Sequence, residues 1–401
     1  MSGLLPVGEA RARILADIET LPTEHAPLDQ AFGRTLASPL AARRTQPPWD
    51  CSAMDGYAVR AADAIEGARL TVVGESAAGR GFSGAIGPGQ AARIFTGAPV
   101  PEGADAILLQ EDASRDGDAV TAREAARTGR HIRRAGLDFR AGETLLNAGR
   151  RLGARDLALA AALGHGVVET VRRPRVAVLA TGDELVRPGV EPGPDQIVAS
   201  NSYAVSAIVA SEGGVTIDLG IAPDDPAAIR AAIERAFAEQ ADVLVTLGGA
   251  SVGDHDLVRP ALIEAGIAID FWKIAMRPGK PMMAGRRGST LALGLPGNPV
   301  SSIVCSLLFL APAVRRLSGR ADVEPRTIPG RLGRDMPEND RREDYVRAAL
   351  TFQPDGTAVA TAFDRQDSSM LKHLAEAECL LIRPANAPAA RAGDPCQLMA
   401  L

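Results

Sequence analysis

The sequence predicts a multidomain protein that combines an α/β domain with β domains. From Arg175 onward, short β-branched runs alternate with helical patterns, which is typical of βαβ units and a parallel-rich sheet between two layers of helices. Before and after that region, short apolar runs are separated by glycine and proline, as in small β domains. The 401 residues also exceed the ~250–300 at which a single hydrophobic core usually stops growing.

The first part of the chain is predicted to contain a β domain with a helix on either side. Val7–Thr20 has the spacing of an amphipathic helix. Between about Pro47 and Asp138, short apolar runs alternate with glycine and proline, which indicates a small β domain. Arg155–Leu163 is predicted to be a buried helix, and Arg172-Arg173-Pro174 marks a boundary.

The α/β domain is placed at residues 174–320. Its expected strands are Val176–Leu179, Val215–Leu219, Asp242–Leu247, Ile267–Phe271 and Ser289–Leu295. Helices are expected over Asn201–Ser211, from Asp224 to about Gln240, and from Pro299. In the second helix an aspartate caps the first turn, and a proline removes one of its unsatisfied N–H groups. Beyond Gly319, three runs predict a C-terminal β barrel or sandwich: Tyr345–Leu350, Ala358–Ala362 and Leu380–Arg383.

Composition and charge exclude several classes of protein. Apolar residues make up 46% and charged residues 23%, which is ordinary for a globular chain and unlike a disordered or fibrous one. A net charge of −5 provides no basic field for nucleic acid or anionic lipid, and 3% aromatic residues disfavour base stacking along a strand. The four cysteines are scattered, so neither a disulfide framework nor a zinc site is predicted.

No secretory or membrane segment is expected. Met1–Ala10 lacks the basic and apolar regions of a signal peptide. The longest apolar stretch, Ile303–Val314, is judged too short to span a bilayer and contains a proline. The protein is therefore expected in the cytoplasm.

The strongest chemical signal lies where expected strands of the α/β domain end. Thr181–Glu184, Gly248–Asp256 and Gly294–Pro299 each follow such a strand, at the sheet edge where α/β proteins bind ligands. Glycines let backbone N–H groups approach an anion, and a helix that begins at Pro299 adds a favourable dipole. A single loop of this kind is more often an ordinary tight turn, but three at one edge indicate an anion site.

Carboxylates beside these loops predict a divalent cation. Glu184, Asp254 and Asp256 supply hard oxygen atoms next to the anion site, which suits Mg²⁺. His255 lies between two of these carboxylates and titrates near neutrality, as a general base does. We favour the simpler interpretation of His255 as a surface loop residue.

A basic segment follows in the sequence. Only three of the 44 basic residues are lysines, namely Lys273, Lys280 and Lys372. Two of these lysines flank Arg277 in Trp272–Pro281, around a Pro-Gly turn. We interpret the segment as a cationic site for phosphate or another dianion, because an ammonium is otherwise so rare in this chain. The alternative is a solvated turn.

The β region also contains irregular segments with polar side chains. Pro48–Ala58 and Ile94–Pro99, the second with the Thr96 hydroxyl, place polar groups among bulky ones, and ordered loops of this kind are often functional. Their aromatic residues can equally serve as structural anchors. Arg130–Asp138 is a basic run, by default a solvated surface and alternatively one that faces an anion.

Seven motifs occur in a fixed order along nearly the whole chain: SAMDGYAVR, RIFTGAPVPEGAD, IRRAGLD, TGDEL, GGASVGDHD, RPGKP and GLPGNPVSS. In this order they make the chain resemble the molybdopterin molybdenumtransferases, the MoeA family that includes the gephyrin E domain. Each motif alone is weak, whereas the ordered set is highly specific. One departure is Leu137, which stands where an acidic residue often precedes Asp138.

The resemblance implies four domains. Residues 1–46 and 139–173 would form an elongated N-terminal domain, with a β domain at 47–138 inserted between them. A three-layer molybdopterin-binding α/β domain at 174–320 and a barrel-like β domain at 321–401 would follow. The family works as a homodimer, in which the active-site cleft combines the inserted domain of one subunit with the α/β domain of the other.

The reaction that the resemblance implies is Mg²⁺-dependent insertion of molybdate into adenylylated molybdopterin, which yields molybdenum cofactor and AMP. A protein that adenylylates molybdopterin and proteins that mature molybdoenzymes are implied as partners. An enzyme that adenylylates the pterin is an alternative, but it would need only the α/β domain. A gephyrin-like scaffold is another, but such chains normally carry further linkers and a second enzymatic domain.

Motif matches assign the site residues. The catalytic residues implied are Asp55, Thr96, Glu184, Asp256, Lys273 and Arg277. The substrate-binding residues implied are Asp138, Gly248, Gly249, Ser251, Lys280, Pro296 and Pro299. Carboxylates of Glu184, Asp224 and Asp256 would hold Mg²⁺. The basic residues would neutralise phosphate and the incoming oxyanion as charge develops, and Asp55 would close the cleft from the partner subunit.

Overall fold

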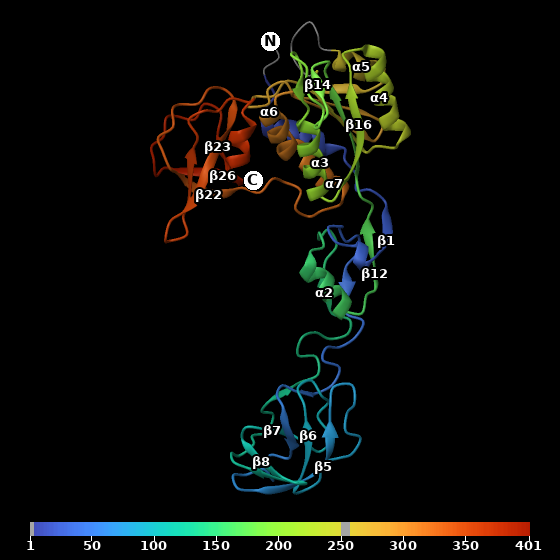
Figure 1. Cartoon of the computed structure of the whole chain (residues 1–401), viewed down its shortest axis with the longest axis vertical. Coiled ribbons are helices and arrows are strands. Elements are labelled where there is room, and N and C mark those ends of the chain that lie inside the picture. The colour runs from blue at the N-terminus through green and yellow to red at the C-terminus, as the bar shows by residue number, and fades with distance from the viewer. Residues whose placement is uncertain (1–3, 250–256) are drawn as a thin grey trace. The chain divides into compact units, whose positions relative to one another are not determined.

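The computed structural model describes residues 4–249 and 257–401, and its contacts divide the chain into two compact units (Figure 1). Unit 1 comprises residues 1–38, 148–155 and 167–401, and unit 2 comprises residues 39–147 and 156–166. Helix α2 (Ala154–Ala162) crosses from one unit into the other.

A six-stranded mixed sheet is the centre of unit 1. In spatial order its strands are β16 (Val215–Ala222), β13 (Arg175–Thr181), β17 (Val243–Leu247), β21 (Thr290–Leu295), β20 (Met283–Arg287) and β18 (Ala268–Trp272). The first four are parallel, β20 pairs antiparallel with β21, and β18 pairs antiparallel with β20. Strand β20 was not predicted, because only its first three residues are buried and two arginines end it.

Helices cover both faces of this sheet. Val176 and Val178 on β13 pack with α3 (Asn201–Ser211), α6 (Pro299–Cys305) and α7 (Ala311–Leu317). Ala177 and Leu179 point the other way, against α4 (Pro226–Ala238) and α5 (Val258–Glu264). Figure 1 shows α4 and α5 on the opposite side of β16 from α3 and α6. Both faces are buried, so the strands read as continuous apolar runs rather than as alternating ones.

One apolar helical run needs a correction to the sequence analysis. Helix α6, the π-helical turn η2 (Ser306–Leu310) and α7 form a continuous run, Pro299–Leu317, that is long and apolar enough to cross a membrane. The judgement that this stretch is too short is wrong, because the helix extends beyond Ile303–Val314 at both ends. However, 78% of its apolar window is buried inside the molecule, as expected for a core helix.

The C-terminal region of unit 1 is a closed five-stranded barrel. Its strands follow the order β23 (Glu343–Phe352), β24 (Ala358–Ala362), β22 (Ile328–Leu332), β26 (Pro395–Ala400) and β25 (Cys379–Arg383). The ring closes because β25 pairs with β23 as well as with β26. The short strand β19 (Met276–Arg277) extends this sheet beside β23, and helix α8 (Leu371–Glu376) lies between β24 and β25 in the chain.

The remaining elements of unit 1 are short. Helix α1 (Val7–Ala16) buries Val7, Ala10 and Ile14 in the core of the central sheet. It ends before the predicted Thr20, ahead of the proline at position 22. Two strand pairs and a 3₁₀ turn complete the unit: β1 (Thr23–Pro27) with β12 (Val167–Val171), β14 (Leu185–Val186) with β15 (Ile197–Val198), and η1 (Leu28–Gln30).

Unit 2 is built on a six-stranded half-barrel sheet. Its strands follow the order β7 (Ala106–Leu109), β4 (Gly56–Val59), β6 (Gln90–Ile94), β5 (Arg69–Ser76), β9 (Ala119–Ala122) and β8 (Ala113–Asp116). Two small pairs accompany it: β3 (Cys51–Ser52) with β10 (Ile132–Arg133), and β2 (Leu40–Ala41) with β11 (Thr144–Leu146). The predicted fold class, a multidomain α/β plus β protein with a C-terminal barrel, is confirmed. The four-domain boundaries stay a prediction.

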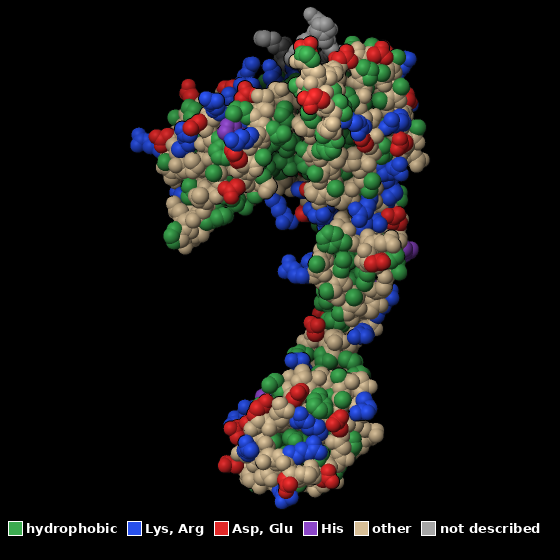
Figure 2. Space-filling model, viewed as in Figure 1, with side chains coloured by type: hydrophobic (Ala, Val, Ile, Leu, Met, Phe, Trp, Pro, Cys, Tyr) green, Lys and Arg blue, Asp and Glu red, His purple; other side chains and the backbone are tan. Residues whose placement is uncertain are grey.

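The face of the molecule in Figure 2 shows basic and acidic side chains interspersed. Because opposite charges alternate on this surface, they form local ion pairs and do not add up to an extended electrostatic potential of one sign. This face therefore agrees with the small net charge of the chain.

The predicted cap of helix α4 allows a test of local stability. The Asp225 carboxylate accepts a hydrogen bond of 2.8 Å from the backbone N–H of Ala228. We expect Asp225→Ala to lower the free energy of unfolding of unit 1 by about 1 kcal/mol, measured by urea titration. The exposed Asp195, substituted in the same way, is the control and should leave the midpoint unchanged.

Candidate active site

A cavity of about 840 Å³ opens at the carboxyl ends of β13, β17 and β21. The three loops singled out in the sequence all contribute to its wall, because the strands before them are parallel neighbours in the sheet. Six predicted site residues line it: Glu184, Asp224, Gly248, Gly249, Pro296 and Pro299. The structure therefore brings these six residues together, and their roles stay predictions.

Hydrogen bonds fix the loop that precedes α6. The Asn201 side chain donates to the carbonyl oxygen of Gly297 at 2.7 Å. Asn298 donates to the hydroxyl of Ser368 at 2.8 Å, and the N–H of Val300 donates to the carbonyl oxygen of Ser368 at 3.1 Å. Neither Asn201 nor the serine pair Ser368-Ser369 was predicted as part of the site. The segment with that serine pair reaches this site only through the folding of the C-terminal region.

Two carboxylates in the cavity wall are suited to a hard cation. The Glu184 carboxylate lies so close to Gly182 that a Cβ there would be 2.3 Å from its Oε2. Asp183 accepts a hydrogen bond of 3.0 Å from the backbone N–H of Asp224, which ties the two loops together. Within the described residues, neither Glu184 nor Asp224 forms an ion pair, so their charges stay available for a cation.

Glu184 and Asp224 are suited to a Mg²⁺ ion that also binds substrate and water, rather than to a metal held by protein ligands alone. In the described part of the chain, no three histidine, cysteine or acidic side chains lie close enough to hold a metal. Mg²⁺ commonly uses one or two carboxylates together with substrate phosphates and water. Asp256, the third predicted ligand, lies outside the described residues, as do Ser251, Asp254 and His255.

Gly248 and Gly249 leave room for the backbone to line the cavity. Both have positive φ angles, +97° and +62°. A Cβ at Gly248 would lie 2.9 Å from the carbonyl oxygen of Thr181, and one at Gly249 would lie 2.1 Å from a methyl group of Val258. Only glycine combines this conformation with such close neighbours.

We expect Gly249→Ala to weaken binding of a pterin substrate about tenfold or more, because relief of the clash moves the loop away from the ligand. Calorimetric titration of the substrate measures this effect. Gly189→Ala is the matched control, because Gly189 also has a positive φ (+91°) but has open space around its Cα. An equal loss of binding affinity in Gly249→Ala and Gly189→Ala would contradict the placement of the Gly249 loop at the ligand.

Two apolar residues lie beside Glu184 in the cavity wall, where the backbone N–H of Ile197 donates to the carbonyl oxygen of Glu184 at 2.7 Å. Ile197 and Val198 form strand β15 and line the cavity, although their exposed fractions are 59% and 43%. Exposed aliphatic side chains at a cavity suit a planar ring. Sequence analysis missed both residues, because two apolar residues after a proline-rich turn give no periodic signal.

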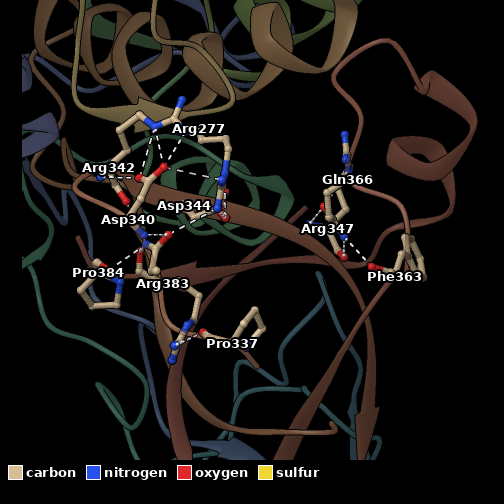
Figure 3. A network of polar contacts seen from close by, with 11 residues as sticks. Arg277, Pro337, Asp340, Arg342, Asp344, Arg347, Phe363, Gln366, Arg383 and Pro384 are labelled. Atoms are coloured by element: carbon tan, nitrogen blue, oxygen red, sulfur yellow. Dashed lines mark hydrogen bonds and ion pairs between the residues drawn. The ribbon is translucent and has the colours of Figure 1, made fainter. Parts of the chain in front are cut away.

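The three predicted basic residues contact different partners. The Lys273 ammonium lies 4.2 Å from the centroid of the Trp272 ring. Arg277 donates through Nε to Asp344 at 3.1 Å and lies 3.8 Å from Asp340 (Figure 3). The hydrogen bond from Arg277 to Asp344 raises the pKa of Arg277 further above its ordinary value. Neither side chain lines the large cavity, so a shared role with Lys280 in anion binding stays a prediction.

Lys280 lines a separate cavity of about 520 Å³ with Leu4 and the 340–342 segment. Within the described residues, neither Lys280 nor Arg341 has an acidic partner, whereas Arg342 pairs with Asp340 at 2.6 Å. Two free cations beside a neutralised pair give this cavity an excess of positive charge. This cavity is therefore suited to an oxyanion.

Arg347 is a buried arginine that the sequence analysis missed. It lies on β23 with an exposed fraction of 1%, and burial lowers its pKa below the ordinary value. Its guanidinium donates to Gln366 Oε1 at 3.1 Å (Figure 3). It also donates to the carbonyl oxygen of Asp367 at 2.9 Å. Arg347 thereby fixes the segment that carries Ser368. A single arginine inside an apolar strand has no distinguishing sequence pattern.

In unit 2 the structure pairs two predicted residues. Asp55 Oδ1 accepts hydrogen bonds from the backbone N–H of Thr96 at 2.7 Å and from its hydroxyl at 2.8 Å. These two hydrogen bonds lower the pKa of Asp55. Arg93 lies between the rings of Tyr57 and Phe95, 5.2 and 4.7 Å from their centroids, and holds the two strands that carry this pair. Asp138 lies elsewhere in unit 2, in the wall of a cavity of that unit.

Three family models match consecutive parts of the chain. The MoeA N-terminal region (domain I and II) matches residues 5–164, a probable molybdopterin binding domain matches residues 177–316, and the MoeA C-terminal region (domain IV) matches residues 329–401. The cavity of about 840 Å³ is built largely from the second of these regions.

Curated relatives match over most of their length. A molybdopterin molybdenumtransferase from Nostoc sp. is 36% identical over 90% of this chain and 85% of its own. Molybdopterin molybdenumtransferase 2 from Mycobacterium tuberculosis is 37% identical over 93% of each chain. Among solved structures, a molybdopterin biosynthesis MoeA protein from Pyrococcus horikoshii matches with a TM-score of 0.82 and 27% identity over all of both chains.

Proposed function

The chain belongs to the MoeA family of molybdopterin molybdenumtransferases, enzymes of molybdenum cofactor biosynthesis, and on that basis we propose that it inserts molybdate into adenylylated molybdopterin and releases AMP. The observation that carries the proposal is the large cavity of unit 1. Carboxylates, a glycine N–H group and two apolar side chains lie together there, as an anionic pterin substrate requires.

Each wall of the cavity has a role in this proposal. The backbone N–H of Gly249 binds a phosphate oxygen, whereas that of Gly248 donates to the carbonyl oxygen of Leu295 at 3.2 Å and holds the loop in place. Ile197 and Val198 contact the pterin ring. Glu184 and Asp224, with Asp256, would hold Mg²⁺. A Mg²⁺ ion held there would neutralise negative charge on the phosphates when the P–O bond to AMP breaks.

Molybdate is assigned to the cavity beside Lys280. Lys280 and Arg341 have no acidic partner among the described residues and can bind an oxyanion. Lys273 and Arg277 are proposed to support this region by their charge, although each already contacts other groups. The remaining described residues of the basic segment contribute no further cation.

We further propose a homodimer in which Asp55, Thr96 and Asp138 act with the α/β domain of the partner subunit. A mixture of Asp55→Asn and Glu184→Gln subunits tests this arrangement, because a mixed dimer regains one intact site. Partial recovery of activity is expected on mixing, and two variants that stay inactive together would contradict it. The enzyme is proposed to act in the cytoplasm, with a molybdopterin-adenylylating protein and molybdoenzyme maturation proteins as partners and no nucleic acid or membrane.

AMP release from adenylylated molybdopterin, with and without molybdate and in the presence of Mg²⁺, tests the reaction. We expect release that depends on molybdate, and tungstate serves as the competing oxyanion. Binding of the pterin without AMP release would contradict the transferase proposal and favour a carrier or scaffold.

A further inference from the structure

Lys273 is held in an unusual backbone conformation. Its φ angle is +82°, in the left-handed region that residues other than glycine and asparagine seldom adopt. Its backbone N–H donates to the carbonyl oxygen of Met282 at 2.9 Å, and its carbonyl oxygen accepts from the N–H of Leu5 at 3.5 Å. A conformation of this kind persists only where the surroundings impose it, and such positions cluster at functional sites.

These hydrogen bonds place Lys273 beside a segment that contributes to two cavities. The next residue, Ile274, donates its N–H to the carbonyl oxygen of Lys280 at 2.9 Å, so the chain around Lys273 is bonded to residues 280 and 282. Lys280 lines the cavity of about 520 Å³, and the adjacent Pro281 lines the cavity of about 840 Å³. Lys273 therefore lies next to the segment where the proposed molybdate site and the proposed pterin site come closest in the chain.

The Lys273 side chain contacts an aromatic ring rather than a carboxylate. Its ammonium lies 4.2 Å from the centroid of the Trp272 ring, inside the ~6 Å over which a cation is attracted to an aromatic face. Among residues 4–249 and 257–401, no acidic side chain pairs with Lys273. A carboxylate would neutralise the ammonium, as Asp344 neutralises Arg277, whereas an uncharged ring fixes its position and leaves its full charge.

Trp272 is itself fixed through the faces of its ring. It ends strand β18, pairs with Met283 of β20, and packs against the core between the sheet and helices α4 and α5. Arg259 of α5 lies 4.7 Å from the same ring centroid. The indole N–H is buried and, in the described part of the chain, has no hydrogen-bond partner. The aromatic face, rather than the N–H group, therefore accounts for an aromatic residue at this position.

We propose that Trp272 is a positioning residue, which holds the Lys273 ammonium as an unneutralised charge beside the two cavities of the reaction. An ammonium held in this way attracts the anionic groups of both substrates without the cost of first breaking an ion pair. This inference rests on the proposed function, because that function supplies the two anions. Trp272 acts only through Lys273 and contacts no reacting atom.

Nuclear magnetic resonance tests the contact without any substrate. The chain has only three lysines, so the full-length protein grown with ¹³C-labelled lysine gives three ε-methylene signals. Lys273→Arg removes one of them and thereby identifies it. We expect the ring current of Trp272 to move this signal upfield of that of Lys372, whose side chain is 82% exposed. In Trp272→Leu the signal should move to the Lys372 position. A Lys273 signal at that position in the wild type would overturn the inference.

A double-mutant cycle separates positioning from a purely structural role. We expect Trp272→Leu to lower kcat/KM for molybdate-dependent AMP release about tenfold, as loss of a cation–π contact allows. In a Lys273→Gln background the same change should have less than about a twofold effect, because the group that Trp272 positions is then gone. Equal reductions in the two backgrounds would overturn the inference.

Conservative and control variants complete the experiment. Trp272→Phe should retain most of the activity and the upfield signal, because it keeps an aromatic face and loses no hydrogen bond. Phe237→Leu is the matched control, because Arg287 lies 4.1 Å from the Phe237 ring on helix α4, away from both cavity linings. It should leave kcat/KM unchanged. If Trp272→Leu fails to fold, Trp272→Met replaces it in both measurements.

The outcome is distinguishable from the fate of the proposed function. Molybdate-dependent AMP release that loses equal activity on Trp272→Leu with and without Lys273 would refute this inference and leave the reaction standing. A Lys273 signal that depends on Trp272, in a protein that releases no AMP, would support the contact and refute the reaction.

Discussion

Glu184→Gln is expected to lower kcat for molybdate-dependent AMP release by about 100-fold or more, because removal of one preorganised charge from an enclosed site has an effect of this size. The Glu184 carboxylate lines the cavity of unit 1, and within the described residues it has no cationic partner that would neutralise it. Glutamine keeps the shape and the position above Gly182 but removes the charge.

The same variant tests the role of Glu184 toward Mg²⁺. We expect the Mg²⁺ concentration for half-maximal activity to rise in Glu184→Gln, because a neutral amide is a weaker ligand for a hard cation. Glu191→Gln is the matched control, because Glu191 is exposed, lies in the connection between β14 and β15 that follows Glu184, and does not line the cavity. A kcat equal to that of the wild type in Glu184→Gln would contradict the placement of Glu184 in the active site.

Glu212→Gln is expected to have the largest effect on stability. The Glu212 carboxylate bonds Arg315 at 2.6 Å and Arg320 at 2.5 Å, and these three side chains are only 12%, 17% and 7% exposed. Loss of the carboxylate leaves two largely buried guanidinium groups without the negative charge that neutralises them. Breaking a buried ion pair in this way costs about 3–5 kcal/mol in free energy of unfolding.

Urea titration measures the effect, with Glu234→Gln as the control. Glu234 pairs with Arg287 at 3.2 Å, but the two side chains are 50% and 42% exposed. An exposed pair of this kind contributes ~0–1 kcal/mol, so the control should stay close to wild type. An equal loss of free energy of unfolding in Glu212→Gln and Glu234→Gln would contradict a stabilising role for the buried ion pairs of Glu212.

The stability of this network should also depend on pH. Burial disfavours the charged form of Glu212, but the hydrogen bonds and charges of Arg315 and Arg320 outweigh it and lower its pKa below 4.5. Arg320 likewise lowers the pKa of Asp322 to about 2. A lowered pKa in the folded state means that the stabilisation is complete above pH 4.5 and is lost as the pH falls through the folded value. Glu212→Gln should therefore show a shallower loss of stability in acid.

Much of the α/β domain could be predicted because its signals are local. Val243–Leu247 is an apolar run in which every residue is buried, and Asp225 and Pro226 mark the start of α4. Parallel strands end at one edge, so the glycine loops after them had to converge. The gathering of Glu184, Asp224 and Gly248 in one cavity followed from this rule.

Other parts of the site depend on contacts between segments far apart in the chain. Arg277 and Asp344 are 67 residues apart, and Asn298 and Ser368 are 70 residues apart. No period or spacing in the sequence relates such pairs. The interpretation of Lys273, Arg277 and Lys280 as one cationic site rested on their closeness in sequence, but their side chains contact different groups.

The sequence by itself determined most strands and helices of the α/β domain, although not β20, together with the convergence of the glycine loops and the membership of the family, since each rests on local patterns or ordered motifs. Only the tertiary structure decided which charges are neutralised and which are available. Arg277 is paired, whereas Lys280 has no acidic partner among residues 4–249 and 257–401, although both lie around the same Pro-Gly turn. The physical reason is that a charge is compensated by whatever the fold brings within a few ångströms, and those partners come from distant segments.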